Sequence, residues 1–209
     1  MMVSSKTHSC IRCGQCCIKG GPVLHNDDIA LIHNNILRPG NLFTIRKGEP
    51  VYHPIEGRLI PAPDELIKIK GTDSSWTCIF FDPAEMACGI YEDRPLECRI
   101  FKCWDTKDSI NFFMQGALSR KAIIHEGGVM EEIISAYEGR FPIPAFMELL
   151  EDAILHTGNV SGEIKINISL DISFRKKIMK YLGAEEAEMD FLFGRPLKAI
   201  ASAMGFSAI

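Results

Sequence analysis

Eight cysteines in the first half of this chain constrain its fold more than any other feature of the sequence. They form two groups, and none follows residue 103: Cys10, Cys13, Cys16 and Cys17, then Cys78, Cys88, Cys98 and Cys103. The first ten residues are polar, whereas a secretory signal carries an apolar stretch. The sequence therefore predicts a reduced, cytoplasmic chain, in which so many thiols indicate metal binding or redox chemistry.

The first group reads C-x2-C-G-x-C-C. Two intervening residues let a tight turn direct two sulfurs at one ion while backbone N–H groups point at them. Gly14 suits such a turn, because glycine adopts positive φ and lets the backbone approach a sulfur without steric cost. Four thiols so close together predict a metal site. A disulfide framework is the remaining alternative, although a chain of this length has little need of one.

The second group has no local chelating pair, so its sulfurs converge only if the chain folds back on itself. Residues 76–81 form a short apolar, aromatic run that predicts a strand, and Cys78 lies within it. We expect a helix with Asp93 near its cap and Pro95 in its first turn, which places Cys98 one turn further on. Cys78 also has a second interpretation, in which a buried thiol only fills the core.

Hydrophobic periodicity predicts an α+β fold, with an irregular cysteine-rich N-terminal half and a mainly helical C-terminal half. The N-terminal half should contain a helix after Asp28 and short antiparallel strands at 42–45, 59–60 and 66–70. Helices are expected at 110–125, 129–137, 147–156 and 173–182, with a short last helix from Leu197. Ile164, Ile166 and Ile168 alternate as in a strand. We expect residues 1–104 to form a metal-binding region and residues 105–209 a helical region packed on it, in one continuous domain.

The charges of the chain exclude some partners. Its 23 Lys and Arg and 27 Asp and Glu give a formal net charge of −4, and the basic residues are interspersed with acidic ones. Nucleic acid is therefore not expected as a partner. No apolar run is long enough to span a membrane. Metal ions are the expected partners, together with a protein partner on the helical half if its apolar residues face outward.

The segments CIRCGQCC and CGIYEDRPLECRIFKC resemble the YkgJ-type cysteine-cluster family of zinc- or iron-chelating proteins. The resemblance covers roughly residues 8–104. Besides the eight cysteines, it extends to the other positions of the family pattern: Gly14, Ile90, Tyr91, Arg94, Pro95, Arg99 and Phe101. A similar cluster occurs in flagellin lysine methylases, although nothing in residues 105–209 identifies a methyl-donor site. The resemblance implies metal chelation and leaves the reaction open.

Thiolate-only sites favour zinc or iron–sulfur clusters over magnesium and calcium. The spacing of Cys10, Cys13 and Cys16 is that of three ligands of a 4Fe–4S cluster, whose fourth ligand comes from a remote cysteine. A single zinc ion needs only two cysteines per turn, so the spacing favours iron–sulfur over zinc. Eight sulfurs leave one site or two open.

Two arginines are candidates for a role beside the metal. Arg94 or Arg99 would offset the negative charge of a thiolate-held cluster and raise its reduction potential. The other interpretation of Arg94 is an ordinary ion pair with Glu92 or Asp93. Three functions follow from the sequence: a cluster-dependent or redox protein, a zinc-binding structural module, and a protein-modifying enzyme resembling the flagellin lysine methylases. Whether the chain is an enzyme stays open.

Overall fold

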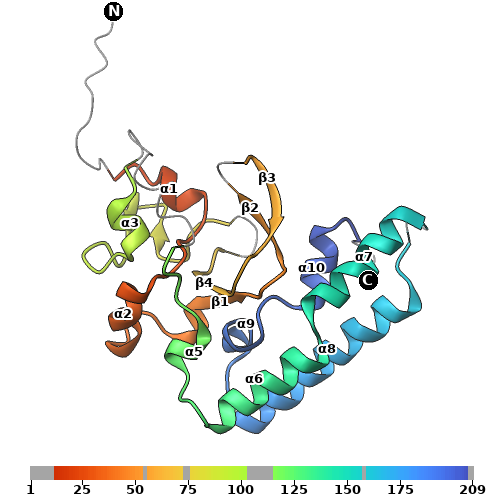
Figure 1. Ribbon diagram of the computed structural model, residues 1–209. Coiled ribbons are helices and arrows are strands. Elements are labelled where there is room, and N and C mark those ends of the chain that lie inside the picture. The colour runs from red at the N-terminus through yellow and green to blue at the C-terminus, as the bar shows by residue number, and fades with distance from the viewer. Residues whose placement is uncertain (1–11, 54–55, 73–75, 103–114, 157–158, 207–209) are drawn as a thin grey trace, which may run out of the picture.

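Short antiparallel strands occupy the N-terminal half of the chain and helices most of the C-terminal half, which confirms the predicted α+β class (Figure 1). The computed structural model describes residues 12–53, 56–72, 76–102, 115–156 and 159–206. The elements of the N-terminal half are α1 (Gln15–Ile18), η1 (Asn26–Asp28), α2 (Ile29–His33), η2 (Pro39–Asn41), β1 (Leu42–Ile45), β2 (Pro50–His53), β3 (Arg58–Pro61), β4 (Leu66–Ile69), β5 (Phe81–Asp82), β6 (Ala87–Cys88) and α3 (Leu96–Ile100).

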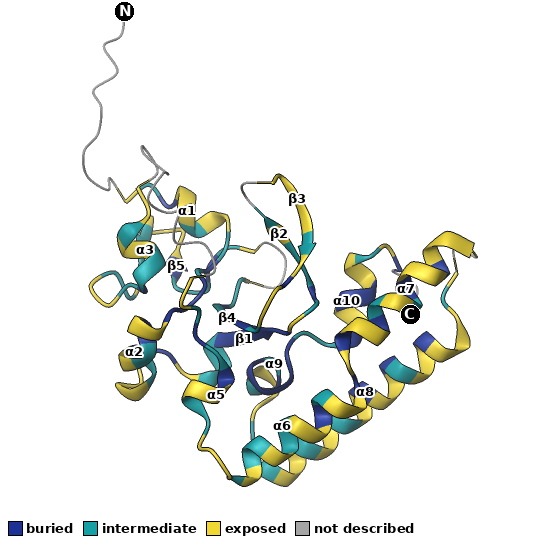
Figure 2. Ribbon diagram, viewed as in Figure 1, coloured by how far each residue is buried: buried dark blue, intermediate teal, exposed yellow. Residues whose placement is uncertain are grey.

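The strands form three two-stranded antiparallel pairs, β1 with β4, β2 with β3, and β5 with β6. The predicted strands at 42–45, 59–60 and 66–70 are thereby confirmed. All four residues of β1 are buried, Thr44 included, because its hydroxyl donates to the Phe191 carbonyl at 2.6 Å. The pair β1–β4 is therefore covered on its faces rather than open to solvent on one side, and it lies at the centre of the molecule (Figure 2).

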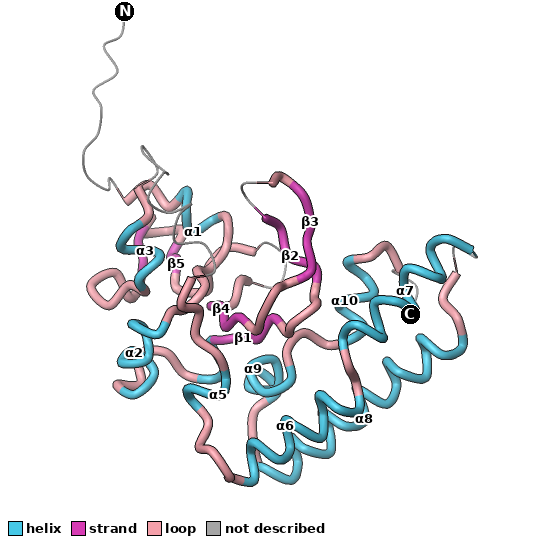
Figure 3. The backbone as a smooth tube through the Cα atoms, in the orientation of Figure 1, coloured by secondary structure: helices cyan, strands magenta, loops and turns pink. Residues whose placement is uncertain are grey.

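Helices form the C-terminal half and pack on one another and on β1 (Figure 3). They are α5 (Arg120–Ile123), α6 (Val129–Arg140), α7 (Ile143–His156), α8 (Gly162–Leu182), η3 (Glu186–Glu188), α9 (Met189–Phe193) and α10 (Leu197–Ala203). Helix α9 lies between β1 on one side and α6 and α8 on the other. No helix in the described parts of the chain is long and apolar enough to cross a membrane.

The alternating isoleucines of residues 164–168 belong to α8, so their prediction as a strand is wrong. Ser161 caps this helix, since its side chain accepts a hydrogen bond from the Ile164 N–H at 3.2 Å. Ile164 and Ile168 are buried, whereas Ile166 is 60% exposed. The spacing of four between the two buried isoleucines is the helical period, and the exposed Ile166 had imitated an alternation of two.

The helix predicted for residues 110–125 is also shorter than expected. Residues 103–114 lie outside the described residues, and so does the predicted boundary between residues 104 and 105. From residue 115 the chain forms a turn and a bridge between His25 and Ala117 before α5 begins. The main hydrophobic core contains residues of both halves, including Leu24, Ile67 and Cys78 together with Tyr137 and Leu150.

Three buried polar side chains hold the helical half together. Arg175 Nε donates to Asp171 Oδ1 at 2.7 Å, and Arg175 Nη2 donates to the Tyr137 hydroxyl at 2.8 Å. The Tyr137 hydroxyl donates in turn to Asp171 Oδ1 at 2.6 Å, and Asp171 Oδ2 accepts from the Leu197 N–H at 2.8 Å. Because further bonds run from Arg175 to the carbonyls of Phe193 and Gly194, this group joins α6, α8 and the chain around α10.

Replacing Arg175 by methionine is expected to destabilise the fold by about 3–5 kcal/mol, because Asp171 then remains buried without its cationic partner. Urea unfolding measured by circular dichroism tests this, as a lower midpoint at an unchanged slope. Lys176→Met is the matched control, since Lys176 is the exposed neighbour on the same helix. Equal midpoints for the two variants would contradict the assignment.

Candidate metal centre

The turn around Gly14 opens the cysteine-bearing segment and has the predicted geometry. Gly14 lies in the left-handed region with φ of 72°, directly before α1. This conformation and the close approach of the Phe81 ring both require glycine. Helix α1 carries Cys16 and Cys17 on successive residues, and their sulfurs lie 3.9 Å apart. Cys13 precedes the turn, and Cys10 lies outside the described residues.

Cys78 lies beside α1 although it is 61 residues away in the chain, as its backbone N–H donates to the Cys17 carbonyl at 2.8 Å. It forms only an isolated bridge with Gly71, so the strand predicted for residues 76–81 is reduced to β5 at Phe81 and Asp82. Cys78 is 6% exposed and belongs to the main core. Burial therefore agrees with a core-filling role, whereas the contact with the Cys17 backbone agrees with a role at the metal site.

Cys88 and Cys98 arrive from two further elements. Cys88 lies on β6, opposite Phe81 in the β5–β6 pair. Cys98 lies on α3, as predicted, but the start of this helix differs from the prediction. Pro95 occupies the position before the first helical residue, and the residues around Asp93 form a turn rather than the cap. Cys103 lies outside the described residues.

Five thiols of these segments interact electrostatically: Cys16, Cys17, Cys78, Cys88 and Cys98. Burial, together with smaller contributions from the neighbouring thiols, raises the pKa of Cys17 to about 12. Burial also raises the pKa values of Cys78 and Cys98, and the other thiols add to the effect. Each added thiolate thus disfavours the next unless a cation is present.

A group of thiols suits a soft metal ion, since a bound cation would offset the repulsion between thiolates that helps to raise these pKa values. In the described part of the chain, which omits Cys10 and Cys103, no three potential ligands are already arranged to hold an ion. Binding would therefore draw the sulfurs together and release their protons. The sulfurs of this group lie on three short elements, α1, β6 and α3, and on the segment of Cys78.

Arg94 and Arg99, the two arginines with a predicted role, differ in their surroundings. The guanidinium carbon of Arg94 lies 3.7 Å from the centre of the Tyr91 ring. Its Nε and Nη1 are buried and have no hydrogen-bond partner within the described residues, which contain no ion pair between Arg94 and Glu92 or Asp93. Arg99 Nη2 instead lies 3.8 Å from an oxygen of the buried Asp28.

A histidine that the sequence did not single out ties α3 to the rest of the fold. His25 is 1% exposed, and its Nδ1 lies 2.8 Å from the Gln115 carbonyl oxygen. Its Nε2 lies 3.3 Å from Glu97 Oε1, and Glu97 Oε2 accepts from the Val23 N–H at 2.8 Å. Both ring nitrogens donate only when the imidazole is protonated, so this contact raises the pKa of His25 above its ordinary 6.5. Glu97 directly precedes Cys98.

The raised pKa of His25 predicts that stability falls as the pH increases. The stabilisation is complete below pH 6.5, the value in the unfolded chain, and disappears as the pH rises through the higher value of the folded chain. Urea midpoints of the wild type and of His25→Gln, measured between about pH 6 and pH 8, should converge as the pH increases. A constant difference between them over this range would show that His25 does not titrate with folding.

Residues 9–117, more than half of the chain, match the family model CxxCxxCC, whose description reads "Putative zinc- or iron-chelating domain". The matched segment contains all eight cysteines together with Arg94 and Arg99. No match was found among curated proteins or among solved structures. Because the family model covers the thiol-bearing segments that the fold brings together, the chain belongs to the CxxCxxCC family of zinc- or iron-chelating domains.

Proposed function

We propose that this chain is a cytoplasmic protein that binds an iron–sulfur cluster through cysteine thiolates and uses it in electron transfer or cluster-dependent chemistry. The observation that carries the proposal is the gathering of Cys16, Cys17, Cys78, Cys88 and Cys98 from four separate segments into one electrostatically coupled group. Ionising several of these neighbouring thiols together is unfavourable without a cation, so the group favours binding one.

The spacing of the first cysteines supports a cluster of the 4Fe–4S kind. Cys10, Cys13 and Cys16 supply three thiolates with the spacing that such clusters use, and a remote cysteine supplies the fourth. Cys17, whose sulfur lies 3.9 Å from that of Cys16, would bind a second metal beside the first with the remaining thiolates, among them Cys103. A bound cluster supplies a soft redox centre, while the chain orients its ligands and limits the access of water to them.

Arg94 and Arg99 would set the charge around this site. The buried Nε and Nη1 of Arg94 offer donors for an anionic group, as expected for a residue beside a thiolate-held metal. Arg99 would act through the Asp28 carboxylate, to which it is already close. A fixed guanidinium beside an anionic cluster raises its reduction potential, because it favours the more negative, reduced state.

A visible absorption spectrum of protein purified without oxygen, with iron, zinc and sulfide analysis, tests the proposal. Broad absorption near about 400 nm with about four irons per chain is the expected result. A colourless protein that contains zinc would contradict it and support the alternative of a zinc-binding structural module. In that case the exposed apolar side chains of α7 and α8, such as Leu155 and Ile166, would provide the partner surface.

The variant Cys78→Ala separates the two interpretations of this residue. Removing a buried sulfur should cost about 1 kcal/mol of stability in the metal-free chain. Because Cys78 is coupled to Cys16 and Cys88, we also expect a lower metal content per chain. The measurements are urea unfolding of metal-free protein and elemental analysis of protein as purified. A loss of stability at full metal content would leave Cys78 as a core residue only.

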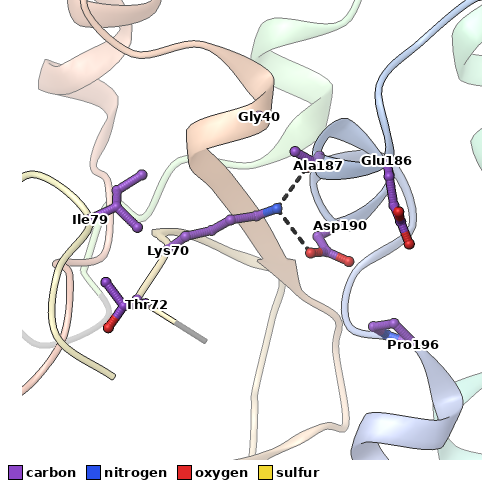
Figure 4. A pocket seen from close by; sticks show the side chains of 9 residues that line it. Gly40, Lys70, Thr72, Ile79, Glu186, Ala187, Asp190 and Pro196 are labelled. Carbon is purple, nitrogen blue, oxygen red and sulfur yellow. Dashed lines mark hydrogen bonds and ion pairs between the residues drawn. The ribbon is translucent and has the colours of Figure 1, made fainter. Parts of the chain in front are cut away.

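A second candidate function, the protein-modifying enzyme, needs a pocket near the thiols, and the lining of one open pocket includes Ile79, the neighbour of Cys78 in the chain (Figure 4). Its volume is about 590 Å³. Gly71 and Ile79 form one wall, on the two segments that bridge at Cys78, and Glu186 and Asp190 form the opposite wall. Lys70 crosses between them, bonded to the Ala187 carbonyl at 2.6 Å and paired with Asp190 at 2.9 Å.

The enzyme candidate predicts that filling this cavity lowers the modification of the substrate and leaves the metal content unchanged. Ala187→Phe places an aromatic ring among the lining side chains. Incubation with a methyl donor and a lysine-rich protein, followed by mass spectrometry, should then show modification by the wild type and less by the variant, at equal metal content. No modification by the metal-loaded wild type would count against this candidate.

A further inference from the structure

Lys68 lies on β4 between the segments that carry the thiols. Its backbone pairs with Phe43 on one side and bridges to Val23 on the other. Its ammonium nitrogen reaches Gly20, where it would lie 4.0 Å from a Cβ added at that position. Gly20 follows α1, and its N–H donates to the Cys17 carbonyl at 3.2 Å. The ammonium group thus lies at the turn that ends the helix of Cys16 and Cys17.

Glu97 and Cys98 approach the same place from α3. Glu97 accepts a hydrogen bond from the Val23 N–H, and Val23 is the bridge partner of Lys68. The charges of Glu97, Cys78 and Cys98 all act on Lys68, and the charge of Lys68 acts in return on Cys78. Lys68 is therefore within electrostatic range of thiols from two different segments and of one carboxylate.

Lys68 is half-buried, and its ammonium group has no close partner among the described residues. Within those residues it makes no hydrogen bond and no ion pair closer than 4 Å. Burial lowers its pKa, while Glu97, Cys78 and Cys98 oppose the shift. Lys68 is half-buried, and a partly desolvated ammonium without a close partner favours anionic groups beside it, so the folded chain gains when anionic sulfur accumulates there.

We propose that Lys68 is a positioning residue of the metal centre, whose positive charge offsets the thiolates of Cys78 and Cys98 when metal binds. The inference rests on the proposed function and adds to it a residue outside the cysteine motifs. The lysine stabilises the metal-bound state, in which the sulfurs are anionic, and destabilises the metal-free state, in which they are protonated. Removing its charge should therefore destabilise the metal-bound state and stabilise the metal-free state.

The test compares Lys68→Met, Lys68→Arg and the control Lys19→Met in the full chain. Lys19 is an exposed lysine beside α1, so its removal changes the net charge equally without changing a desolvated group. Zn²⁺ affinity is measured by competition with a chromophoric chelator under reducing, anaerobic conditions. Thermal unfolding of each metal-free variant is measured by circular dichroism.

We expect Lys68→Met to bind Zn²⁺ about 10- to 100-fold more weakly than the wild type, as for the loss of a residue that supports metal ligands. Lys68→Arg should restore most of the affinity, and Lys19→Met should leave it nearly unchanged. The metal-free Lys68→Met chain should unfold at the same or a higher temperature than the wild type. This combination distinguishes a charge that acts on the metal from a side chain needed only for folding.

Three results would overturn the inference. Wild-type Zn²⁺ affinity in Lys68→Met shows that the charge has no part in metal binding, while the proposed function stands. Weak binding together with a lower melting temperature of the metal-free chain, not restored by arginine, shows that Lys68 is structural. A wild-type chain that takes up neither Zn²⁺ nor iron removes the proposed function and this inference with it.

Discussion

Cys16→Ser is expected to lose more metal affinity than any exchange outside the thiols. The variant removes the thiolate that lies 3.9 Å from Cys17 and that acts electrostatically on Cys78 and Cys98. Loss of an outer residue that supports a metal ligand costs about 10- to 100-fold in affinity, and loss of the ligand itself should cost more. Elemental analysis and visible absorption of the anaerobically purified variant measure this effect. Cys13→Ser should behave likewise, because it shortens the same C-x2-C-x2-C group.

The exposure of Cys16 makes this result interpretable. An exposed thiol contributes little to packing, so serine at this position should leave the metal-free fold intact. Gln15→Ser is the matched control, as Gln15 is the exposed neighbour on the same helix and carries no sulfur. Full metal content in both cysteine variants would contradict the assignment of the first cysteine group to the metal.

The sequence predicted the parts of the fold in which a local pattern had one structural solution. Gly14 illustrates this, because a turn between cysteines needs positive φ, and the structure has it at 72°. Leu42 to Ile45 form a short run with glycine and proline on either side, and this run forms β1. By contrast, Ile164, Ile166 and Ile168 fit a period of two, and only the cap at Ser161 and the exposed Ile166 distinguish the helix.

The candidate site was predictable in its ligand types and not in its surroundings. The spacing of the cysteines identifies the thiols as ligands, whereas the link between Cys78 and Cys17 is a backbone contact across 61 residues that no local pattern encodes. Lys68 gave a weak signal, as a basic residue between the buried Ile67 and Ile69 of one strand. His25 gave none, since its partner Glu97 lies 72 residues away. Long-range polar contacts of this kind depend on the completed fold.

Gly14→Ala is expected to destabilise the chain by about 2–4 kcal/mol and to lower its metal content. One contribution is the left-handed backbone, which costs a residue with a Cβ roughly 1–2 kcal/mol. The second is steric, because the new Cβ would lie 2.5 Å from Phe81 Cε2, and the Phe81 ring is itself buried. Relief of the overlap moves either β5, whose partner strand carries Cys88, or the turn that leads into α1. Either shift separates the thiols.

Two control glycines separate these contributions. Gly183 has φ of 64° with open space around its Cα, so Gly183→Ala should show the backbone cost alone. Gly139 lies within α6 and is equally open, so Gly139→Ala should stabilise the chain by about 0.5–1 kcal/mol. Urea midpoints and metal analysis of the three variants are compared. A loss for Gly14→Ala no larger than for Gly183→Ala, at full metal content, would contradict the steric part. A larger loss accompanied by metal release would instead show that the contact of Gly14 with Phe81 holds the two cysteine-bearing segments in register, because neither control touches them.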